Sequence, residues 1–196
     1  MKPRTANVKR TTRETDISVK VNLDGTGKSS ISTGIAFLDH MLEILSRHSL
    51  IDMTIKASGD LAVDYHHTVE DLGLTLGDAL NKALGDRKGI VRYGSSYVTM
   101  DEALSRVAID LGGRPYLVKS MVCRKKKLME LELGLFDDFF QSLSVQARMN
   151  LHIDQLKGVE AHHAYESVFK ALARALRMAS ERDARDKGIP SSKGAI

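Results

Sequence analysis

The chain repeats a pattern at about half its length, and this repeat restricts the folds open to it. Residues 66–70 and 162–166 both have the pattern His-His-x-x-Glu, and they lie 96 residues apart (162 − 66). A second pair of segments, 37–42 and 135–140, is offset by 98 residues (138 − 40). Within each half these segments have helical periodicity, and an alternating strand pattern separates them. The sequence therefore predicts two similar halves, well below the repetition of a solenoid.

Short alternating runs supply the strands of each half. They cover residues 17–21, 29–32 and 52–56 in the first half, and 95–98, 106–110, 116–118 and 150–154 in the second. We therefore predict an α+β fold in which each half is a small, mainly antiparallel sheet with two helices on one face. The glycine-containing segment 85–89 is the natural joint. We predict a first repeat over residues 1–88, a second repeat with a C-terminal tail over residues 89–196, and one functional unit from both.

The composition indicates a cytoplasmic protein without a membrane partner. A single cysteine, Cys123, excludes an intrachain disulfide and fits a reducing compartment. The first residues lead into no apolar run, so we expect no signal peptide. No stretch approaches the ~20 apolar residues that a membrane-spanning helix needs.

The positive charge favours an anionic partner, and its distribution favours a small one. The net charge is +4, but apart from residues 124–127, which we predict in a solvated loop or strand end, the cations are scattered. Five phenylalanines, five tyrosines and no tryptophan offer little surface for stacking against single-stranded nucleic acid. We therefore expect no nucleic-acid partner and a small phosphorylated ligand.

The doubled motif is made of residue types that bind metal ions. Residues three or four apart share a helix face, so either histidine of a pair can stand beside the glutamate. Two adjacent histidines point about 100° apart on a helix and cannot comfortably serve one ion. We therefore predict two metals, each collecting ligands from both copies. Two amphipathic helices with polar starts are the simpler alternative, but four of the seven histidines fall in these two places.

Further motifs join these along the chain, at residues 37–42, 64–71, 89–94, 100–104, 113–115, 162–177 and 190–194. In their order and content they resemble the imidazoleglycerol-phosphate dehydratase family over essentially the whole chain. The resemblance implies a fold like that of ribosomal protein S5 domain 2. It also implies a monofunctional hydro-lyase of L-histidine biosynthesis, which dehydrates D-erythro-imidazole glycerol phosphate to imidazole acetol phosphate.

The resemblance further implies two Mn²⁺ ions per active site, at subunit contacts of a 24-subunit homo-oligomer. It assigns the metal-ligand positions to His40, His66, His67, Glu70, His162, His163 and Glu166. Asp138 stands where some members carry histidine and others an acid, and we include it as a ligand candidate because carboxylates suit Mn²⁺.

The resemblance also supplies residues for the substrate. It places Glu14 at the active site as an acid–base carboxylate, where the residues alone indicate only an exposed N-terminal strand. Around the phosphate it gathers donors that suit a phosphoryl group, namely Arg92, Arg114, Lys170, Ser191 and Lys193. Taken alone, Lys170 equally fits an i,i+4 pair with Glu166. His48 fits either a helix C-terminal cap or a place near the substrate, and His152 is predicted to face away from the core.

The chemistry explains why two metals are needed. With one metal ion on each ring nitrogen, the substrate's own imidazole could lose its N–H proton. The ionised ring would then expel the side-chain hydroxyl, after which a carboxylate removes the carbon proton. From the residues alone, two alternatives stay open. Another dinuclear metal-dependent hydrolase would use the same ligands to activate water. A nucleic-acid-binding module would suit the positive charge, but it lacks a concentrated basic and aromatic surface.

Overall fold

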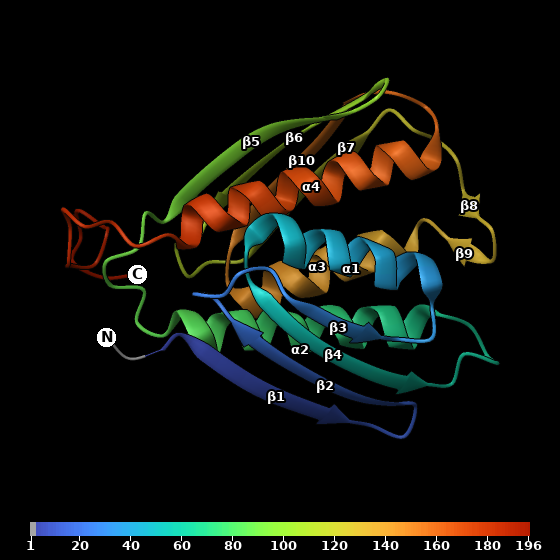
Figure 1. Ribbon diagram of the computed structural model, residues 1–196, viewed down its shortest axis with the longest axis horizontal. Coiled ribbons are helices and arrows are strands. Elements are labelled where there is room, and N and C mark those ends of the chain that lie inside the picture. The colour runs from blue at the N-terminus through green and yellow to red at the C-terminus, as the bar shows by residue number, and fades with distance from the viewer. Residues whose placement is uncertain (1–2) are drawn as a thin grey trace.

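The computed structural model describes residues 3–196 and confirms the α+β class (Figure 1). Met1 and Lys2, which belong to the predicted first repeat, lie outside the described residues. The first half contains β1 (Thr5–Thr11), β2 (Thr15–Asn22), β3 (Ser29–Ser32), α1 (Ala36–Ser49), β4 (Asp52–Gly59) and α2 (His66–Leu84). The second contains β5 (Tyr93–Met100), β6 (Ala103–Asp110), β7 (Tyr116–Met121), β8 (Lys127–Leu128), β9 (Leu131–Glu132), α3 (Leu135–Ala147), β10 (Asn150–Lys157) and α4 (Ala161–Ser180).

The two four-stranded sheets have the same topology, which confirms the internal duplication. Their strand orders are β1-β2-β4-β3 and β5-β6-β10-β7. In each sheet the last strand in this order, β3 or β7, runs parallel to its neighbour, and the other pairs are antiparallel. Parallel neighbours need a crossover connection, which α1 provides between β3 and β4, and α3 between β7 and β10. The sheets are therefore mainly antiparallel, as predicted, with one parallel edge pair each.

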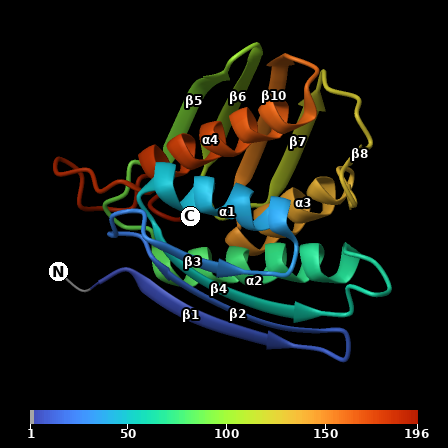
Figure 2. The ribbon, with the colours of Figure 1, turned by 45° about the vertical axis from the view of Figure 1, so that its right-hand side comes forward.

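Each sheet buries one face, and the burial follows the alternation of the sequence. In β2 the side chains of Ile17, Val19 and Val21 are fully buried, and the residues between them are not. His152 on β10 is exposed between the buried Leu151 and Ile153, as predicted. The other face of each sheet points away from the helices (Figure 2).

The four helices lie between the two sheets and pair across the halves (Figure 2). Helix α2 covers β1 and β2, and α4 covers β5 and β6. Helix α1 then packs against α4, and α2 against α3, so each pair joins one helix from each half. Phe136, Phe139 and Phe140 of α3 meet Phe169 of α4 with ring centroids 5.4–6.0 Å apart. Each of these fully buried rings contributes on the order of 1.5–3 kcal/mol of stability.

All four helices begin at the same end of the molecule (Figure 1). Strands β3, β4 and β10 each end there and pass through a short connection into α1, α2 and α4. The predicted metal ligands lie in the first two turns of the helices, so this arrangement gathers them at one end.

Arg87 is a buried cation at the joint between the halves, with only 4% of its surface exposed. Its guanidinium donates hydrogen bonds to the carbonyl oxygens of Leu111, Ala147 and Arg148 and to Oδ1 of Asn81. Burial, assisted by the charge of Arg148, lowers the pKa of Arg87. The joint is thereby bonded to the end of α2 and to both ends of the connection between β6 and β10.

Three further sequence features lie away from the helix starts. Cys123 is buried as a free thiol. Residues 124–126 are exposed and outside any helix or strand, as predicted for the basic run, and Lys127 begins β8. Within residues 3–196, no helix has both the length and the apolar character needed to cross a membrane.

Gly73 allows α2 and α3 to approach closely. A Cβ at this position would lie 2.7 Å from the carbonyl oxygen of Phe139 and 2.9 Å from Cβ of Ser142. The neighbouring oxygen belongs to a helix backbone, so it cannot rotate away, and the two helices would have to separate.

We expect Gly73→Ala to destabilise the protein even though alanine is the better helix former. Alanine gains about 1 kcal/mol in helix propensity, whereas overpacking costs about 1–3 kcal/mol. A lower thermal midpoint at fixed protein concentration would measure the net loss. Gly134→Ala is the matched control, because Gly134 has φ −59° and no atom within 4 Å of the added Cβ. Equal midpoints for the two variants would contradict the close approach.

Candidate metal centre and anion pocket

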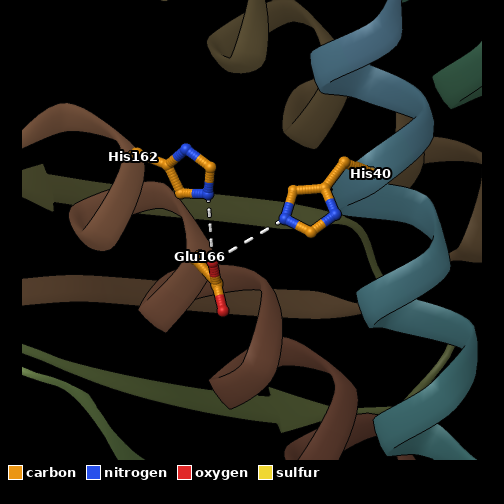
Figure 3. Close-up of side chains that lie close together, drawn as sticks. All are labelled: His40, His162 and Glu166. Atoms are coloured by element: carbon orange, nitrogen blue, oxygen red, sulfur yellow. Dashed lines mark hydrogen bonds and ion pairs between the residues drawn. The ribbon is translucent and has the colours of Figure 1, made fainter.

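Three side chains of the kinds that bind metals converge where α1 meets α4 (Figure 3). His162 Nε2 lies 3.1 Å from Glu166 Oε2, and His40 Nε2 lies 3.7 Å from the same oxygen. One ligand atom from each residue lies within 4.8 Å of the others. Two imidazoles and a carboxylate form a donor set that divalent transition metals accept, so these residues fit a metal ion.

Local helix geometry places these groups together. His162 and Glu166 are four residues apart on one face of α4, and the side chain of Glu160 caps that helix by accepting a hydrogen bond from the backbone N–H of His163 at 2.8 Å. Across the helix pair, the rings of His40 and His162 are 5.4 Å apart. The ring of Phe37 meets His162 edge-on at 5.3 Å and closes one side of the group.

Glu166 is an anionic ligand candidate held in a partly apolar position. Burial raises its pKa, but the hydrogen bond from Lys170 Nζ at 2.7 Å and the neighbouring His162 outweigh this, so the pKa of Glu166 lies below its ordinary value. One carboxylate oxygen binds Lys170, and the other faces the two histidines. Lys170 thus makes the i,i+4 pair that its spacing allowed.

A second cluster occupies the equivalent place where α2 meets α3. His66 Nε2 lies 3.4 Å from Glu70 Oε2, and His66 Nδ1 lies 3.4 Å from Asp138 Oδ2. By the repeat offsets, Asp138 stands where the first cluster has His40. The two acids face opposite nitrogens of the ring, so the three donors do not point to one centre. Across the described part of the chain, only the first cluster has three donors within 4.8 Å of one another.

The other histidine of each pair faces a different set of carboxylates. His67 Nδ1 lies 3.0 Å from Asp60, and its Nε2 lies 3.9 Å from Glu14. His163 Nδ1 lies 2.8 Å from Glu102, and its Nε2 lies 3.9 Å from Asp101. The hydrogen bonds that His67 and His163 donate to Asp60 and Glu102 raise the pKa values of the two histidines.

Asp60, Asp101 and Glu102 were not predicted as site residues, although the repeat contains a signal for Glu102. Glu14 lies in the turn between β1 and β2, and Glu102 lies in the equivalent turn between β5 and β6, 88 residues later (102 − 14). Aligning the first hairpins of the halves, instead of only their helices, would have found it. Asp60 directly follows β4, which ends at Gly59, and has no comparable signal.

Four of the five predicted phosphate-binding residues line one pocket of about 660 Å³ beside the C-terminal tail. These residues are Arg92, Arg114, Ser191 and Lys193. Arg92 donates two hydrogen bonds to Asp110 and a third to the carbonyl oxygen of Pro190, which fixes the tail against the sheet. The bonds to Asp110 raise the pKa of Arg92. Arg148 and Ser192 line the same pocket, so an anion there could be bound by four basic side chains and two hydroxyls.

Lys170 lies away from this pocket, beside Glu166. His48 lies in the last turn of α1 and does not line the pocket. Burial, with the charges of Lys170 and Arg174, lowers the pKa of His48 and so favours its neutral imidazole. The distance between the anion pocket and Glu166 follows from their positions along α4. The pocket residue Arg92 bonds through its backbone N–H to Ala179, thirteen residues (179 − 166) after Glu166, or about 20 Å of helix.

A duplicated α+β fold with imidazole and carboxylate donors at its helix starts, and a separate cationic pocket, is typical of a metal-dependent enzyme with an anionic substrate. The family model of imidazoleglycerol-phosphate dehydratase matches residues 33–176. The chain belongs to the imidazoleglycerol-phosphate dehydratase family. This confirms the resemblance inferred from the motifs and the prediction of a hydro-lyase.

Individual relatives are similar over their full length. The imidazoleglycerol-phosphate dehydratase of Hahella chejuensis is 55% identical, with 100% of both chains covered, and that of Albidiferax ferrireducens is 56% identical over 98% of this chain and 95% of the relative. The crystal structure of the Staphylococcus aureus enzyme has a TM-score of 0.82 at 36% identity, covering 91% of this chain and 99% of that one. The structure from Pyrococcus furiosus has a TM-score of 0.83 at 35% identity, covering 96% and 100%.

Proposed function

We propose that this chain dehydrates D-erythro-imidazole glycerol phosphate to imidazole acetol phosphate in L-histidine biosynthesis, in the cytoplasm. The group formed by His40, His162 and Glu166 carries this proposal, since it supplies a metal-binding donor set at the helix starts. The relatives that bear the name of this activity cover nearly the whole chain at 52–56% identity. The single buried thiol of Cys123 suits a reducing compartment.

We propose a centre with two Mn²⁺ ions per active site. Its donors are His40, His66, His67, Glu70, His162, His163 and Glu166, with Asp138 as a further candidate. A bound ion would acidify the N–H of the substrate imidazole, as coordination lowers the pKa of water from about 15.7 to about 7. The ligand types accept several divalent metals, and the family resemblance favours manganese.

The side chains of the protein would carry the remaining steps. Arg92, Arg114, Ser191 and Lys193 line the pocket and would bind the phosphate, with Lys170, which lies beside Glu166, and His48 as further contacts. The hydroxyl on the carbon beside the ring leaves, and Glu14 removes the proton from the next carbon, so that one water is lost in total. The resulting enol then takes a proton on carbon and becomes the ketone.

The distance between the clusters and the pocket supports an active site shared between copies of the chain. Within one chain the cationic pocket lies about 20 Å along α4 from Glu166, which exceeds the length of a three-carbon phosphate with one ring. We therefore propose that a second copy brings its pocket to the metal cluster of the first. The resemblance suggests 24 copies, and in each copy residues 1–88 and 89–196 act as one unit.

Removal of metal should abolish dehydration, and Mn²⁺ should restore it. The purified protein is treated with a chelator, then assayed with imidazole glycerol phosphate before and after adding Mn²⁺, with metal content measured in parallel. Recovery at about two ions per chain is expected. A metal-loaded protein that hydrolyses simple phosphate esters and leaves imidazole glycerol phosphate unchanged would overturn the proposal in favour of a dinuclear hydrolase.

Glu14→Gln should suppress turnover without changing metal content. General base catalysis typically contributes about 10²–10⁴-fold, so kcat should fall by this order. The side chain of Glu14 is about half exposed, and the substitution preserves its size, so folding should be unaffected. Glu43→Gln, on the exposed face of α1, is the control and should keep wild-type activity. Near-normal kcat for Glu14→Gln would remove Glu14 from the mechanism.

Lys193→Met should weaken binding of the phosphorylated substrate. A hydrogen bond to a charged group is worth about 1.5–3 kcal/mol, so kcat/KM should fall by about 10–100-fold. Lys187→Met changes another exposed lysine of the same tail outside the pocket, and its kinetics should match the wild type. Equal losses in both variants would indicate a general charge effect and contradict a phosphate site in this pocket.

A further inference from the structure

We propose that Asp60 and Glu102 are positioning residues that orient His67 and His163 toward the metal ions. Each carboxylate accepts a hydrogen bond from Nδ1 of its histidine, at 3.0 Å and 2.8 Å respectively. This proposal rests on the proposed function, in which both histidines are ligands.

A hydrogen bond at Nδ1 determines which nitrogen can bind a metal. When a carboxylate accepts the proton of Nδ1, the ring is held in the tautomer whose Nε2 has a free lone pair. Histidine ligands in proteins commonly donate their second N–H to a carboxylate in this way. His67 and His163 both have this arrangement, and their Nε2 atoms point away from Asp60 and Glu102. The first histidine of each pair instead faces a carboxylate of the proposed ligand set.

The positions of both carboxylates are fixed by backbone geometry. The N–H of Asp60 donates to the carbonyl oxygen of Glu14, and its own carbonyl accepts from Val63. Glu102 lies in the two-residue turn between Met100 and Ala103, which are paired in the β5–β6 ladder. Each acid is therefore held by the strands that precede the metal-binding helix.

The two carboxylates come from positions that are not equivalent in the repeat, and a steric reason accounts for this. The position equivalent to Asp60 is Gly158, 98 residues later (158 − 60), where φ is +93° and an added Cβ would lie 2.6 Å from Cα of Ala103. No side chain fits there, so in the second half the hairpin glutamate, Glu102, takes the place of Asp60.

Because Glu102 takes the place of Asp60 in the second half, the two hairpin glutamates, Glu14 and Glu102, have different roles. In the first half Asp60 occupies Nδ1 of His67, and Glu14 is left 3.9 Å from Nε2, free to accept a proton from the substrate. In the second half Glu102 is committed to His163. In the first half the arrangement leaves Glu14 for proton transfer, and in the second half it gives its repeat partner Glu102 the positioning role, with Asp101 as the carboxylate 3.9 Å from Nε2 of His163.

The test compares Mn²⁺ affinity and turnover in the full-length protein. Asp60→Asn and Glu102→Gln are stripped with a chelator and titrated with Mn²⁺ by calorimetry, with Glu43→Gln as control. Loss of a carboxylate that orients a ligand typically weakens metal binding by about 10–100-fold. Both variants should keep the wild-type thermal midpoint and recover turnover at saturating Mn²⁺, whereas Glu14→Gln should bind Mn²⁺ normally and stay slow.

The outcomes separate this proposal from the proposed function. If the stripped wild type binds no Mn²⁺, the metal centre itself is wrong. If the wild type binds and both variants bind equally tightly, the positioning role is wrong and the metal centre stands. The positioning role would also be overturned by a loss of affinity that comes with a lower thermal midpoint. The same holds if turnover does not recover at saturating Mn²⁺. Asp60→Glu and Glu102→Asp keep the acceptor, and partial recovery of affinity in them is the expected result.

Discussion

The packing of α1 against α4 and of α2 against α3 is the contact on which the rest of the structure depends. Each pair takes one helix from each half, and the buried phenylalanines of α3 and α4 join the pairs into one core. The helices begin at one end, so the same contact that buries the apolar faces brings His40 to Glu166 and His66 to Asp138. The proposed metal ligands are therefore a product of the core: neither half contains a complete cluster.

Periodicity predicted where the elements lie, but it does not encode their partners. The strand over residues 29–32 matches the structure, because the alternation of a strand follows from local backbone geometry. The parallel edge pairs and the crossed helix pairs depend on contacts distant in sequence, which a hydrophobic pattern leaves open. For the same reason the spacing of Lys170 fitted two partners equally, and only the structure shows the pair with Glu166. Asp60 lies in a turn that looks ordinary in the sequence.

Electrostatics distinguishes two halves that share one backbone plan. In the first cluster the single acid, Glu166, is shared between Lys170 and two histidines, whereas the second cluster has two acids around His66. The anion pocket concentrates its cations at the opposite end of α4, where Asp110 holds Arg92 in place. The two halves thus share equivalent backbone positions, and different residues at a few of these positions make the halves chemically different.

Arg87 has a consequence for how the protein unfolds. Its guanidinium is buried, and its four acceptors belong to both halves, with Asn81 in the first and Leu111, Ala147 and Arg148 in the second. Separating the halves would break the hydrogen bonds from Arg87 to the three carbonyl oxygens of the second half, and a hydrogen bond from a charged donor is worth about 1.5–3 kcal/mol. An intermediate with one half folded and the other unfolded is therefore disfavoured, which ties the two copies of the repeat into a single cooperative unit.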